Sequence, residues 1–265
     1  MRWQGGGWDL EILVNGYPGK AVPHGGLGWS TVVLLRGHGR IVVLDGGGYG
    51  LRKVLGGMLK ERGVALGDVT DLLLSHAHHD HSVNWPMFRE ARIHIGRKEL
   101  AWALGVPWGE TAVPEHAIAA LSQWPTLQLM DDGQEVLPGI TAHLAPGHTP
   151  GHLIFVVAGS GQDCVLLQDA VKNRVELTTR TTDMTYDPAV SRATIDMVWA
   201  ICRARPGCLL IPGHDLPMTV ENGVPRAIGH HKAAIRGWFG TTLDEMTRFD
   251  LAPLDPEPSP EGATP

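Results

Sequence analysis

The sequence SHAHHDH at residues 75–81 constrains this chain more than any other feature. Within six positions, 76–81, it places four imidazoles and one carboxylate, just after the apolar run 71–74. Neutral imidazole and carboxylate groups bind divalent zinc well, and a turn points alternate residues in different directions. Open α/β sheets place their ligand sites at strand ends. The segment therefore predicts a metal site at the end of a buried strand, in preference to a solvated histidine-rich loop.

Strand-like and helical segments recur in both halves of the chain. Apolar, β-branched runs predict strands at residues 10–16, 30–36, 40–45, 71–75, 126–130, 135–144, 153–158, 164–168 and 208–211. Helical patterns predict helices at residues 51–62, in parts of 92–123, at 188–204 and at about 225–247. Residues 37–39 (GHG) predict a turn, and Asp187 followed by Pro188 predicts a helix start. The order of elements predicts a layered α/β protein.

The composition is that of an ordinary folded protein, and the net charge argues against one class of binding partner. Of its 265 residues, 43% are hydrophobic and 19% are charged, which excludes wholesale disorder and a coiled coil. The formal net charge of −6 argues against a nucleic acid as the main partner. The three cysteines, Cys164, Cys202 and Cys208, form no CxxC pair. Neither a disulfide framework nor a thiolate zinc site is therefore expected.

The two ends of the chain differ from its middle. The N-terminal segment lacks the apolar core of a signal peptide, and no apolar run reaches the roughly 20 residues that span a bilayer. We therefore expect a cytoplasmic protein with no membrane partner. The segment 251–265 combines many prolines with acidic and small residues, which predicts a disordered or loosely attached tail.

Three further motifs accompany the histidine cluster. They are PGHTPGH at 146–152, Asp169 directly after a strand-like run, and IPGHD at 211–215. Together with HxHxDH, in this order and each at a strand end, they resemble the metallo-β-lactamase-fold hydrolase superfamily over residues 10–250. The resemblance implies an α/β fold, a four-layer αββα sandwich of two similar halves that forms a single domain over residues 1–250.

The resemblance also implies a dinuclear metal site. It assigns the first metal to His76, His78 and His148 and the second to Asp80, His81 and His214, with Asp169 bridging them. Two divalent ions are implied, with Zn²⁺ expected and Mn²⁺, Fe²⁺ or Co²⁺ left open. Asp45, in an Asp-Gly-Gly motif, would support the ligands from behind. Asp80 would also accept a proton from the attacking water.

Several residues beside these motifs are candidates for the substrate pocket. Trp85 follows the histidine cluster and is a candidate pocket wall, whereas Trp102 is expected in the core. Lys172 and Arg174 follow the bridging carboxylate, where they receive a substrate carboxylate unless salt bridges within their loop hold them. Similar acyl-homoserine lactonases have a tyrosine at the position of Lys172. Tyr186 would take that role only if its loop folds back.

Two more segments have open roles. His152 either orients the loop that bears His148 through a hydrogen bond or simply begins a strand. The glycine- and proline-rich segment 17–28 either flanks the substrate as a mobile flap or only connects two strands.

A dinuclear site of this kind supplies nucleophilic water near neutral pH and stabilises an oxyanion. We therefore expect a zinc-dependent hydrolase that cleaves a carbonyl ester, lactone or thioester of a small-molecule substrate, with lactonase-like chemistry slightly preferred. The alternatives are phosphodiester cleavage, β-lactamase-like amide hydrolysis and a non-enzymatic metal-dependent sensor or binding protein. A homodimer stays an open alternative, because no repeat or apolar seam in the sequence tests it.

Overall fold

The computed structural model describes residues 1–23 and 25–252, so nearly all of the predicted tail at 251–265 lies outside the described residues. The chain forms two compact units, Met1–Ile228 and Gly229 onward. Both predicted halves lie in the first unit, whereas the domain expected over residues 1–250 ends within the second. Among the described residues, no helix is both long and apolar enough to cross a membrane.

A seven-stranded sheet forms the first half of the first unit, in the order β1-β2-β5-β6-β7-β8-β9. Its strands are β1 (Arg2–Gly5), β2 (Trp8–Val14), β5 (Val32–Gly37), β6 (Arg40–Leu44), β7 (Asp71–Leu73), β8 (Arg92–Gly96) and β9 (Leu127–Met130). The first four are antiparallel neighbours, and β6 to β9 run parallel. The parallel strands therefore end on the same side, where β6 leads to Asp45 and β7 leads to the histidine cluster.

A second seven-stranded sheet forms the other half, in the order β10-β11-β12-β13-β14-β15-β16. Its strands are β10 (Glu135–Leu137), β11 (Ile140–Leu144), β12 (Leu153–Val157), β13 (Cys164–Gln168), β14 (Leu209–Pro212), β15 (Met218–Glu221) and β16 (Val224–Ala227). Only β13 and β14 are parallel, and they lead directly to Asp169 and His214. The single strand predicted at 135–144 is a hairpin, because Gly139 (φ 71°) turns the chain after Pro138.

The helices of the first unit are α1 (Arg52–Lys60), α2 (His79–Ser82), α3 (Arg97–Gly105), α4 (Glu115–Ser122), α5 (Arg174–Thr179) and α6 (Pro188–Ala204). Four of them, α1, α3, α4 and α6, lie where helices were predicted, whereas α2 and α5 were not predicted. The start of α6 is confirmed in detail. Pro188 occupies its first position, and the Asp187 carboxylate accepts hydrogen bonds from the backbone N–H groups of Ala189 and Val190.

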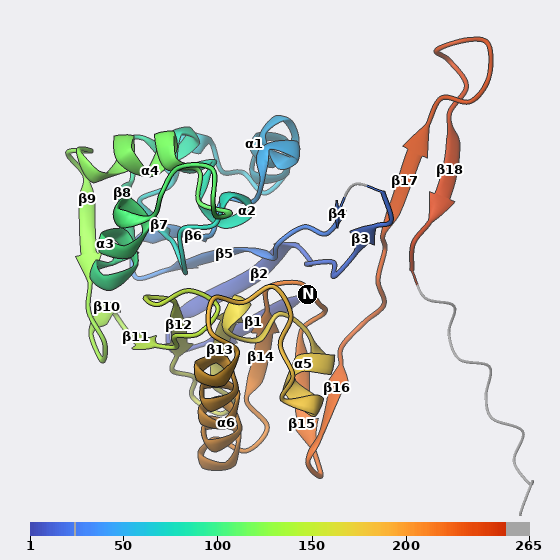
Figure 1. The fold of residues 1–265 in the computed structure, drawn as a ribbon. Helices are drawn as coiled ribbons and strands as arrows, with labels where there is room; N and C mark the ends of the chain where they lie inside the picture. The colour runs from blue at the N-terminus through green and yellow to red at the C-terminus, as the bar shows by residue number, and fades with distance from the viewer. Residues whose placement is uncertain (24, 253–265) are drawn as a thin grey trace, which may run out of the picture. The chain divides into compact units, whose positions relative to one another are not determined.

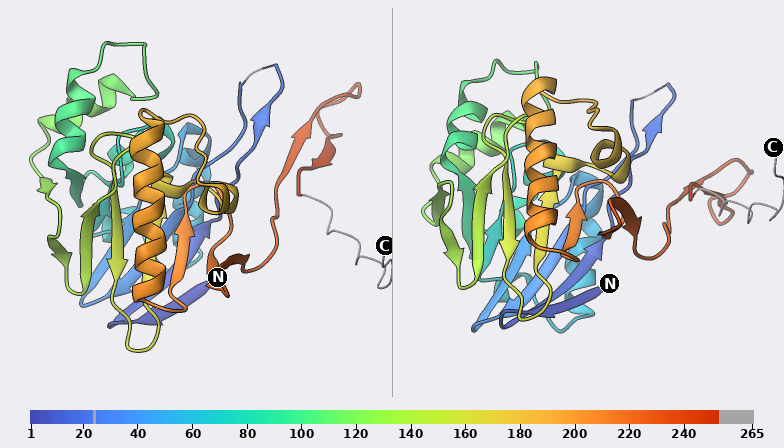
Figure 2. Two further views of the ribbon diagram at one scale, coloured as in Figure 1. Left: turned by 60° about the horizontal axis from the view of Figure 1, so that its bottom comes forward. Right: turned by 90° about the horizontal axis from the view of Figure 1, so that it is seen from below.

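Three apolar clusters build four layers in the first unit. One cluster lies between the sheets and joins Leu10 of β2 to Phe155 of β12. Leu55 of α1 and Ile118 of α4 cover the outer face of the first sheet. Ile195 of α6 belongs to the cluster on the outer face of the second sheet. Helices therefore lie on both outer sides of the paired sheets (Figure 1 and Figure 2), which confirms the predicted αββα sandwich.

The helix predicted at about 225–247 is wrong. β16 pairs with β15 around Asn222 and Gly223, which both have left-handed backbones (φ 50° and 76°). In the second unit, β17 (Ala234–Gly237) pairs with β18 (Thr247–Asp250). An Asn-Gly dipeptide favours a two-residue hairpin turn, and Gly229 (φ 92°) turns the chain again before β17. These local turn preferences override the helical spacing of the apolar residues.

Candidate metal centre

The seven predicted ligands converge from both sheets of the first unit. They follow the ends of β7, β11, β13 and β14: His76 and His78 come directly after β7, Asp80 and His81 lie in α2, His148 follows β11, Asp169 follows β13 and His214 follows β14. Strand ends that meet in one place bring together side chains that are far apart in the sequence.

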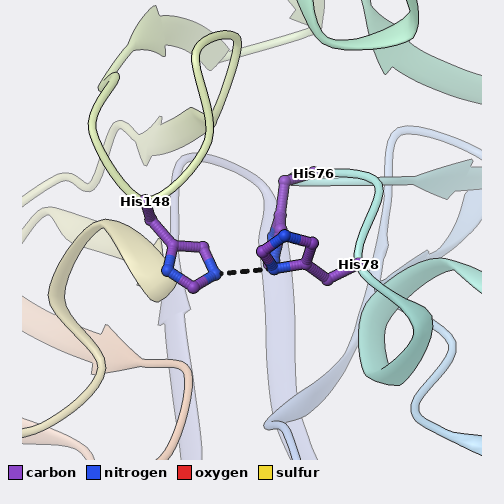
Figure 3. Close-up of side chains that lie close together, drawn as sticks. All are labelled: His76, His78 and His148. Atoms are coloured by element: carbon purple, nitrogen blue, oxygen red, sulfur yellow. Dashed lines mark hydrogen bonds between the residues drawn. The ribbon is translucent and has the colours of Figure 1, made fainter. Parts of the chain in front are cut away.

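Potential ligand atoms form three overlapping groups. The nitrogen and carboxylate oxygen atoms lie within 4.8 Å of one another in the sets His76/His78/His148, His76/His81/Asp169 and Asp80/His81/His214. The first and third sets are the two predicted triads. Figure 3 shows the first triad, in which His78 points its Nδ1 at His148 Nε2, 2.9 Å away.

Asp169 lies between the two triads. Its Oδ2 is 3.2 Å from Nε2 of His148 and 3.3 Å from Nε2 of His214. Its Oδ1 is 3.3 Å from Nε2 of His81. Asp169 therefore contacts a histidine of the first triad and two members of the second, as a bridging carboxylate must.

Unpaired polar atoms show that this donor set fits metal ions. Nε2 of His76 and Nδ1 of His148 are buried and have no hydrogen-bond partner within the described part of the chain, and Nε2 of His81 and Oδ1 of Asp169, 3.3 Å apart, are buried without a well-aligned hydrogen bond. A buried polar atom without a partner is destabilising by about 1–3 kcal/mol. Imidazole and carboxylate donors are the groups that divalent zinc prefers, so bound cations would satisfy these atoms.

Burial and charge divide the histidines of the site into two kinds. Burial lowers the pKa of His76 and of His148 well below the usual 6.5, and lowers that of His78 to about 4. These three rings are therefore neutral, the form that binds a metal. Burial also opposes charge on His214, but the carboxylate of Asp169 outweighs it and raises the pKa of His214 to about 10. A divalent cation here would replace that proton.

Asp45 supports the site from behind, as predicted for a residue that orients a ligand. Its Oδ2 lies 2.8 Å from Nδ1 of His81, and the carboxylate accepts hydrogen bonds from both the backbone N–H and the hydroxyl of Ser75. Asp45 is fully buried and has a left-handed backbone (φ 55°), which L-residues rarely adopt. Its contact with Nδ1 leaves Nε2 of His81 directed at the ligand cluster.

Glu99 is the main residue that the sequence analysis missed. This buried carboxylate of α3 joins two ligand loops. Oε1 accepts a hydrogen bond from the N–H of Ala77 (2.8 Å), and Oε2 accepts from the hydroxyl of Thr149 (2.7 Å) and the N–H of Gly151 (3.1 Å). Ala77 separates the first two histidine ligands, and Thr149 follows the third. Burial raises the pKa of Glu99 to about 7. The sequence did contain a signal for Glu99: it lies four positions before Ala103, so both residues fall on the same, buried side of α3, where a carboxylate needs hydrogen-bond partners.

Gly213 leaves the room that the bridging carboxylate needs. A Cβ atom on Gly213 would lie 1.9 Å from Oδ1 of Asp169 and 2.9 Å from the backbone carbon of Gln168. Gln168 itself has a left-handed backbone (φ 46°). The carbonyl of Gly213 also accepts a hydrogen bond from the N–H of Thr31, which ties the loop to the first sheet. The glycine of the IPGHD motif is thus a spatial requirement.

A cavity of about 600 Å³ gives access to the ligands. Its lining includes His78, Asp80, His148, Asp169 and His214, together with residues from segment 17–28. That segment contains the short strands β3 (Lys20–Ala21) and β4 (Gly25–Gly26), and Lys20 forms an ion pair with Asp183 of the loop after α5. Residues 17–20, 26 and 28 of this segment therefore line the cavity, and the role of a mobile flap stays a prediction.

The prediction for Trp85 is wrong. Its side chain is 2% exposed, packs in the core with Trp124, and donates its ring N–H to the carbonyl of Ala117. Trp102, expected in the core, packs against the same apolar cluster and also lines the cavity. Its ring lies 6.2 Å from that of His78, because α3 presents it over the site while Trp85 faces inward beneath α4.

Tyr186 lies at the cavity, because its loop folds back. Its N–H donates to the carbonyl of His148, and its ring packs 5.8 Å from that of Trp102. Lys172 also lines the cavity, with its ammonium 2.9 Å from the carboxylate of Glu176.

Arg174 is a second correction among the predicted pocket residues. Its guanidinium pairs with Asp215 at 3.2 Å, and Arg174 is not among the residues that line the cavity. The salt-bridged alternative is therefore the one that the structure shows for this arginine.

His152 is buried with its ring 4.8 Å from that of His76. Neither ring nitrogen has a hydrogen-bond partner among residues 1–23 and 25–252, and burial lowers the pKa of this histidine to about 3. The expected hydrogen bond to the loop of His148 is thus not found. The backbone carbonyl of His152 accepts from the N–H of Ala145, as a residue at a strand start does.

Comparison with known families agrees with this site. The family model described as metallo-beta-lactamase superfamily matches residues 25–214, a range that ends at the last predicted ligand. The chain belongs to the metallo-beta-lactamase superfamily. Among curated proteins, none matches the sequence.

Several solved structures share the fold of this chain. AidC, described as a dizinc quorum-quenching lactonase in complex with a product, has a TM-score of 0.70 at 18% identity, over 86% of this chain and 97% of that one. An N-acyl homoserine lactone hydrolase, with the product N-hexanoyl-L-homoserine at its catalytic metal centre, has a TM-score of 0.64 at 17% identity, over 80% and 94%. A putative metallo-beta-lactamase from Thermotoga maritima has a TM-score of 0.61 at 21% identity, over 80% and 99%. At identities this low, these likenesses establish a shared fold and nothing about activity.

Proposed function

We propose that this member of the superfamily is a dinuclear metal-dependent hydrolase that cleaves a neutral lactone or carbonyl ester. The observation that carries the proposal is a pair of ligand triads, joined by Asp169, at an open cavity. Structural zinc sites are generally closed by four protein ligands. Here His78 and His214 line the cavity, so a substrate can reach the site.

The donor set assigns each ion its ligands. His76, His78 and His148 would hold one divalent cation, and Asp80, His81 and His214 the other, with Asp169 between them. Two such cations make nucleophilic water available near neutral pH and stabilise negative charge on a carbonyl oxygen. Zn²⁺ is the proposed metal because imidazole-rich sites suit it and because AidC is a dizinc enzyme.

The chain's own residues would position and deprotonate the reactants. The Asp80 side chain is 21% exposed at the cavity, and its Oδ2 lies 3.3 Å from Nε2 of His214. We propose that this carboxylate accepts the proton of the attacking water. We propose that Tyr186, which lines the cavity on the loop that folds back to His148, donates a hydrogen bond from its hydroxyl to the substrate. Glu99 keeps two ligand loops at a fixed separation.

The ion pairs of the cavity favour a neutral substrate. Its two lysines are both neutralised: Lys20 pairs with Asp183, and Lys172 pairs with Glu176. Anionic substrates are usually held by cationic side chains that are available to form charge-assisted hydrogen bonds. A β-lactam and a glutathione thioester carry carboxylates away from the scissile bond, and a phosphodiester carries its negative charge on the scissile phosphoryl group, whereas a lactone with an amide-linked acyl chain carries no charge. This difference favours the lactone.

Apolar surface beside the ligands suits an acyl group. Trp102 and Tyr186 pack together on one wall of the cavity, and Met184 lines it beside them. Apolar walls with few polar groups are typical of small-molecule sites. In the N-acyl homoserine lactone hydrolase with this fold, the bound product carries a hexanoyl chain. We therefore propose an acylated lactone as the substrate.

The proposal is tested with a charge-graded set of substrates on Zn²⁺-loaded protein. The set contains N-hexanoyl-homoserine lactone, a neutral aryl ester, S-lactoylglutathione, a carboxylate-bearing β-lactam and bis(p-nitrophenyl) phosphate. We expect kcat/KM to be highest for the two neutral substrates, and to fall at least about 100-fold in His78→Ala and Asp169→Asn. His116→Ala, an exposed histidine outside the cavity, is the matched control and should keep wild-type activity.

Two results would overturn the proposal. A preference for the phosphodiester would assign phosphodiester cleavage. Binding of the lactone without turnover, by protein that retains its metals, would assign the site to a sensor or binding protein.

A further inference from the structure

The second unit contains a hairpin formed by β17 and β18 (Figure 1), and the register of the two strands gives it two unlike faces. In β17 and β18, Ile235 lies opposite Phe249, and Arg236 lies opposite Arg248. Because side chains alternate along a strand, the apolar pair shares one face and the arginines share the other. Phe239, from the connecting loop, packs edge-on against Phe249 with 5.6 Å between ring centroids. Ile235, Phe249 and Phe239 are 41%, 44% and 73% exposed.

The outer edge of β18 has no partner strand among the described residues, because β17 and β18 form a two-stranded sheet. The N–H of Leu251 donates to the carbonyl of Ala233 across the hairpin. In an antiparallel pair, every second residue directs its backbone N–H and C=O groups at the partner strand. Phe249 lies two residues before Leu251, so its backbone groups also point at β17. The backbone N–H and C=O groups of Arg248 and Asp250 therefore point outward, along the open edge.

This open edge is complementary to itself. When two copies of β18 lie antiparallel about a twofold axis at Phe249, Arg248 of each copy faces Asp250 of the other. Arg248 and Asp250 form an ion pair with each other within one chain, and the twofold pairing gives each a second partner of opposite charge across the interface. Opposite charges directly across an antiparallel pair are stabilising. The same two residues carry the outward backbone groups, so backbone hydrogen bonds form there as well. The two Phe249 residues meet at the centre as a non-hydrogen-bonded pair, the kind in which side chains approach most closely.

We propose that a second copy of this chain pairs its β18 with this edge, forming a four-stranded sheet from two hairpins. An isolated two-stranded hairpin is only marginally stable in water, and further strands with an apolar face stabilise it. The pairing also removes an exposed strand edge, which otherwise invites unspecific association. It is an isologous contact of the kind found in twofold dimers. The proposal is independent of the hydrolase chemistry.

The charge of the connecting loop disfavours a membrane as the occupant. Residues 238–246 expose Trp238, Phe239 and Leu243, but they also include Asp244 and Glu245 and contain no Lys or Arg. Anionic headgroups attract basic segments and repel acidic ones. A protein surface with the same alternation of charge is the better match, and β18 itself provides one.

The test is sedimentation velocity on the full chain across a concentration series, with two single charge reversals in β18. Arg248→Asp places carboxylates face to face across the proposed interface, and Asp250→Arg places guanidinium groups face to face. Each reversal changes two symmetry-related pairs, so we expect the dimer dissociation constant to rise at least about tenfold. Arg226→Asp makes the same charge change at an exposed position of β16, outside the hairpin, and should stay dimeric. None of these residues belongs to the metal centre, so lactone turnover should not change.

A mixture of the two reversals separates the proposed contact from effects within one chain. In a mixed dimer, both cross-strand pairs are again of opposite charge, so the mixture should regain the wild-type dissociation constant although each variant alone is monomeric. A monomeric wild type, reversals that leave the dimer intact, or a mixture that stays monomeric would each overturn the proposal. A monomeric wild type that co-sediments with zwitterionic vesicles would assign the hairpin to a membrane.

Discussion

The substitution Glu99→Gln tests whether the buried carboxylate that joins the two ligand loops titrates at the raised pKa that its burial implies. The pKa of Glu99 is raised by burial to about 7, against an ordinary value of 4.5. Because the pKa is higher in the folded chain, the folded state binds this proton more tightly than the unfolded state does. The resulting stabilisation is complete below pH 4.5 and is lost as the pH rises through about 7.

The magnitude follows from the two pKa values. Each unit of difference corresponds to about 1.36 kcal/mol, so full titration of Glu99 lowers the free energy of unfolding by about 3 kcal/mol between about pH 4 and pH 8. Glutamine has no proton to lose in this range. As the pH rises, the wild type should therefore lose about 3 kcal/mol of unfolding free energy relative to Glu99→Gln.

The assay is urea unfolding of metal-free protein at a series of pH values, followed by circular dichroism. Glu61→Gln is the matched control, because it removes the same charge from a side chain that is 78% exposed. The control should show the wild-type pH dependence. If wild type and Glu99→Gln differ by a constant amount across the whole range, Glu99 does not titrate as the structure requires and the argument fails.

Three further predictions concern the cavity and its floor. Gly213→Ala forces a methyl group against Oδ1 of Asp169, so plasma emission spectrometry should find less bound metal and turnover should fall at least about 100-fold; full metal content would contradict this. Glu176→Gln frees the Lys172 ammonium, so kcat/KM for carboxylate-bearing substrates should rise about tenfold relative to neutral ones, and an unchanged ratio would refute the neutral-substrate argument. Trp102→Ala should raise KM for hexanoyl but not acetyl homoserine lactone about tenfold, and an equal effect on both would remove Trp102 from the acyl wall.

Short sequence patterns predicted the parts of the fold that depend only on residues adjacent in the sequence. Asp187 and Pro188 begin α6 as expected, because capping involves only the first turn of a helix. Residues 37–39 form the expected turn, with His38 and Gly39 in left-handed conformations. The same reasoning failed at 225–247, where apolar spacing was weighed above the Asn-Gly turn that the sequence also contains.

The metal centre was predictable for a different reason. The four motifs hold their ligands at strand ends, and the family resemblance supplied the pairing of distant motifs that local pattern does not contain. Trp85 and Trp102 show the limit of this approach. Which of them faces the cavity depends on where α3 lies over the sheet, and that position is set by packing between distant segments. Glu99 was missed because its three hydrogen-bond donors come from two loops far from it in the sequence.

The central claim is that two metal ions, held on either side of Asp169, are both needed for hydrolysis of a neutral lactone. The most direct measurement is a titration of metal-free protein with Zn²⁺, in which bound metal and turnover of N-hexanoyl-homoserine lactone are followed together. The account predicts that turnover keeps rising until two ions are bound per chain, and that Asp169→Asn abolishes it. Full turnover with one bound ion, or turnover that survives a chelator, would contradict the account.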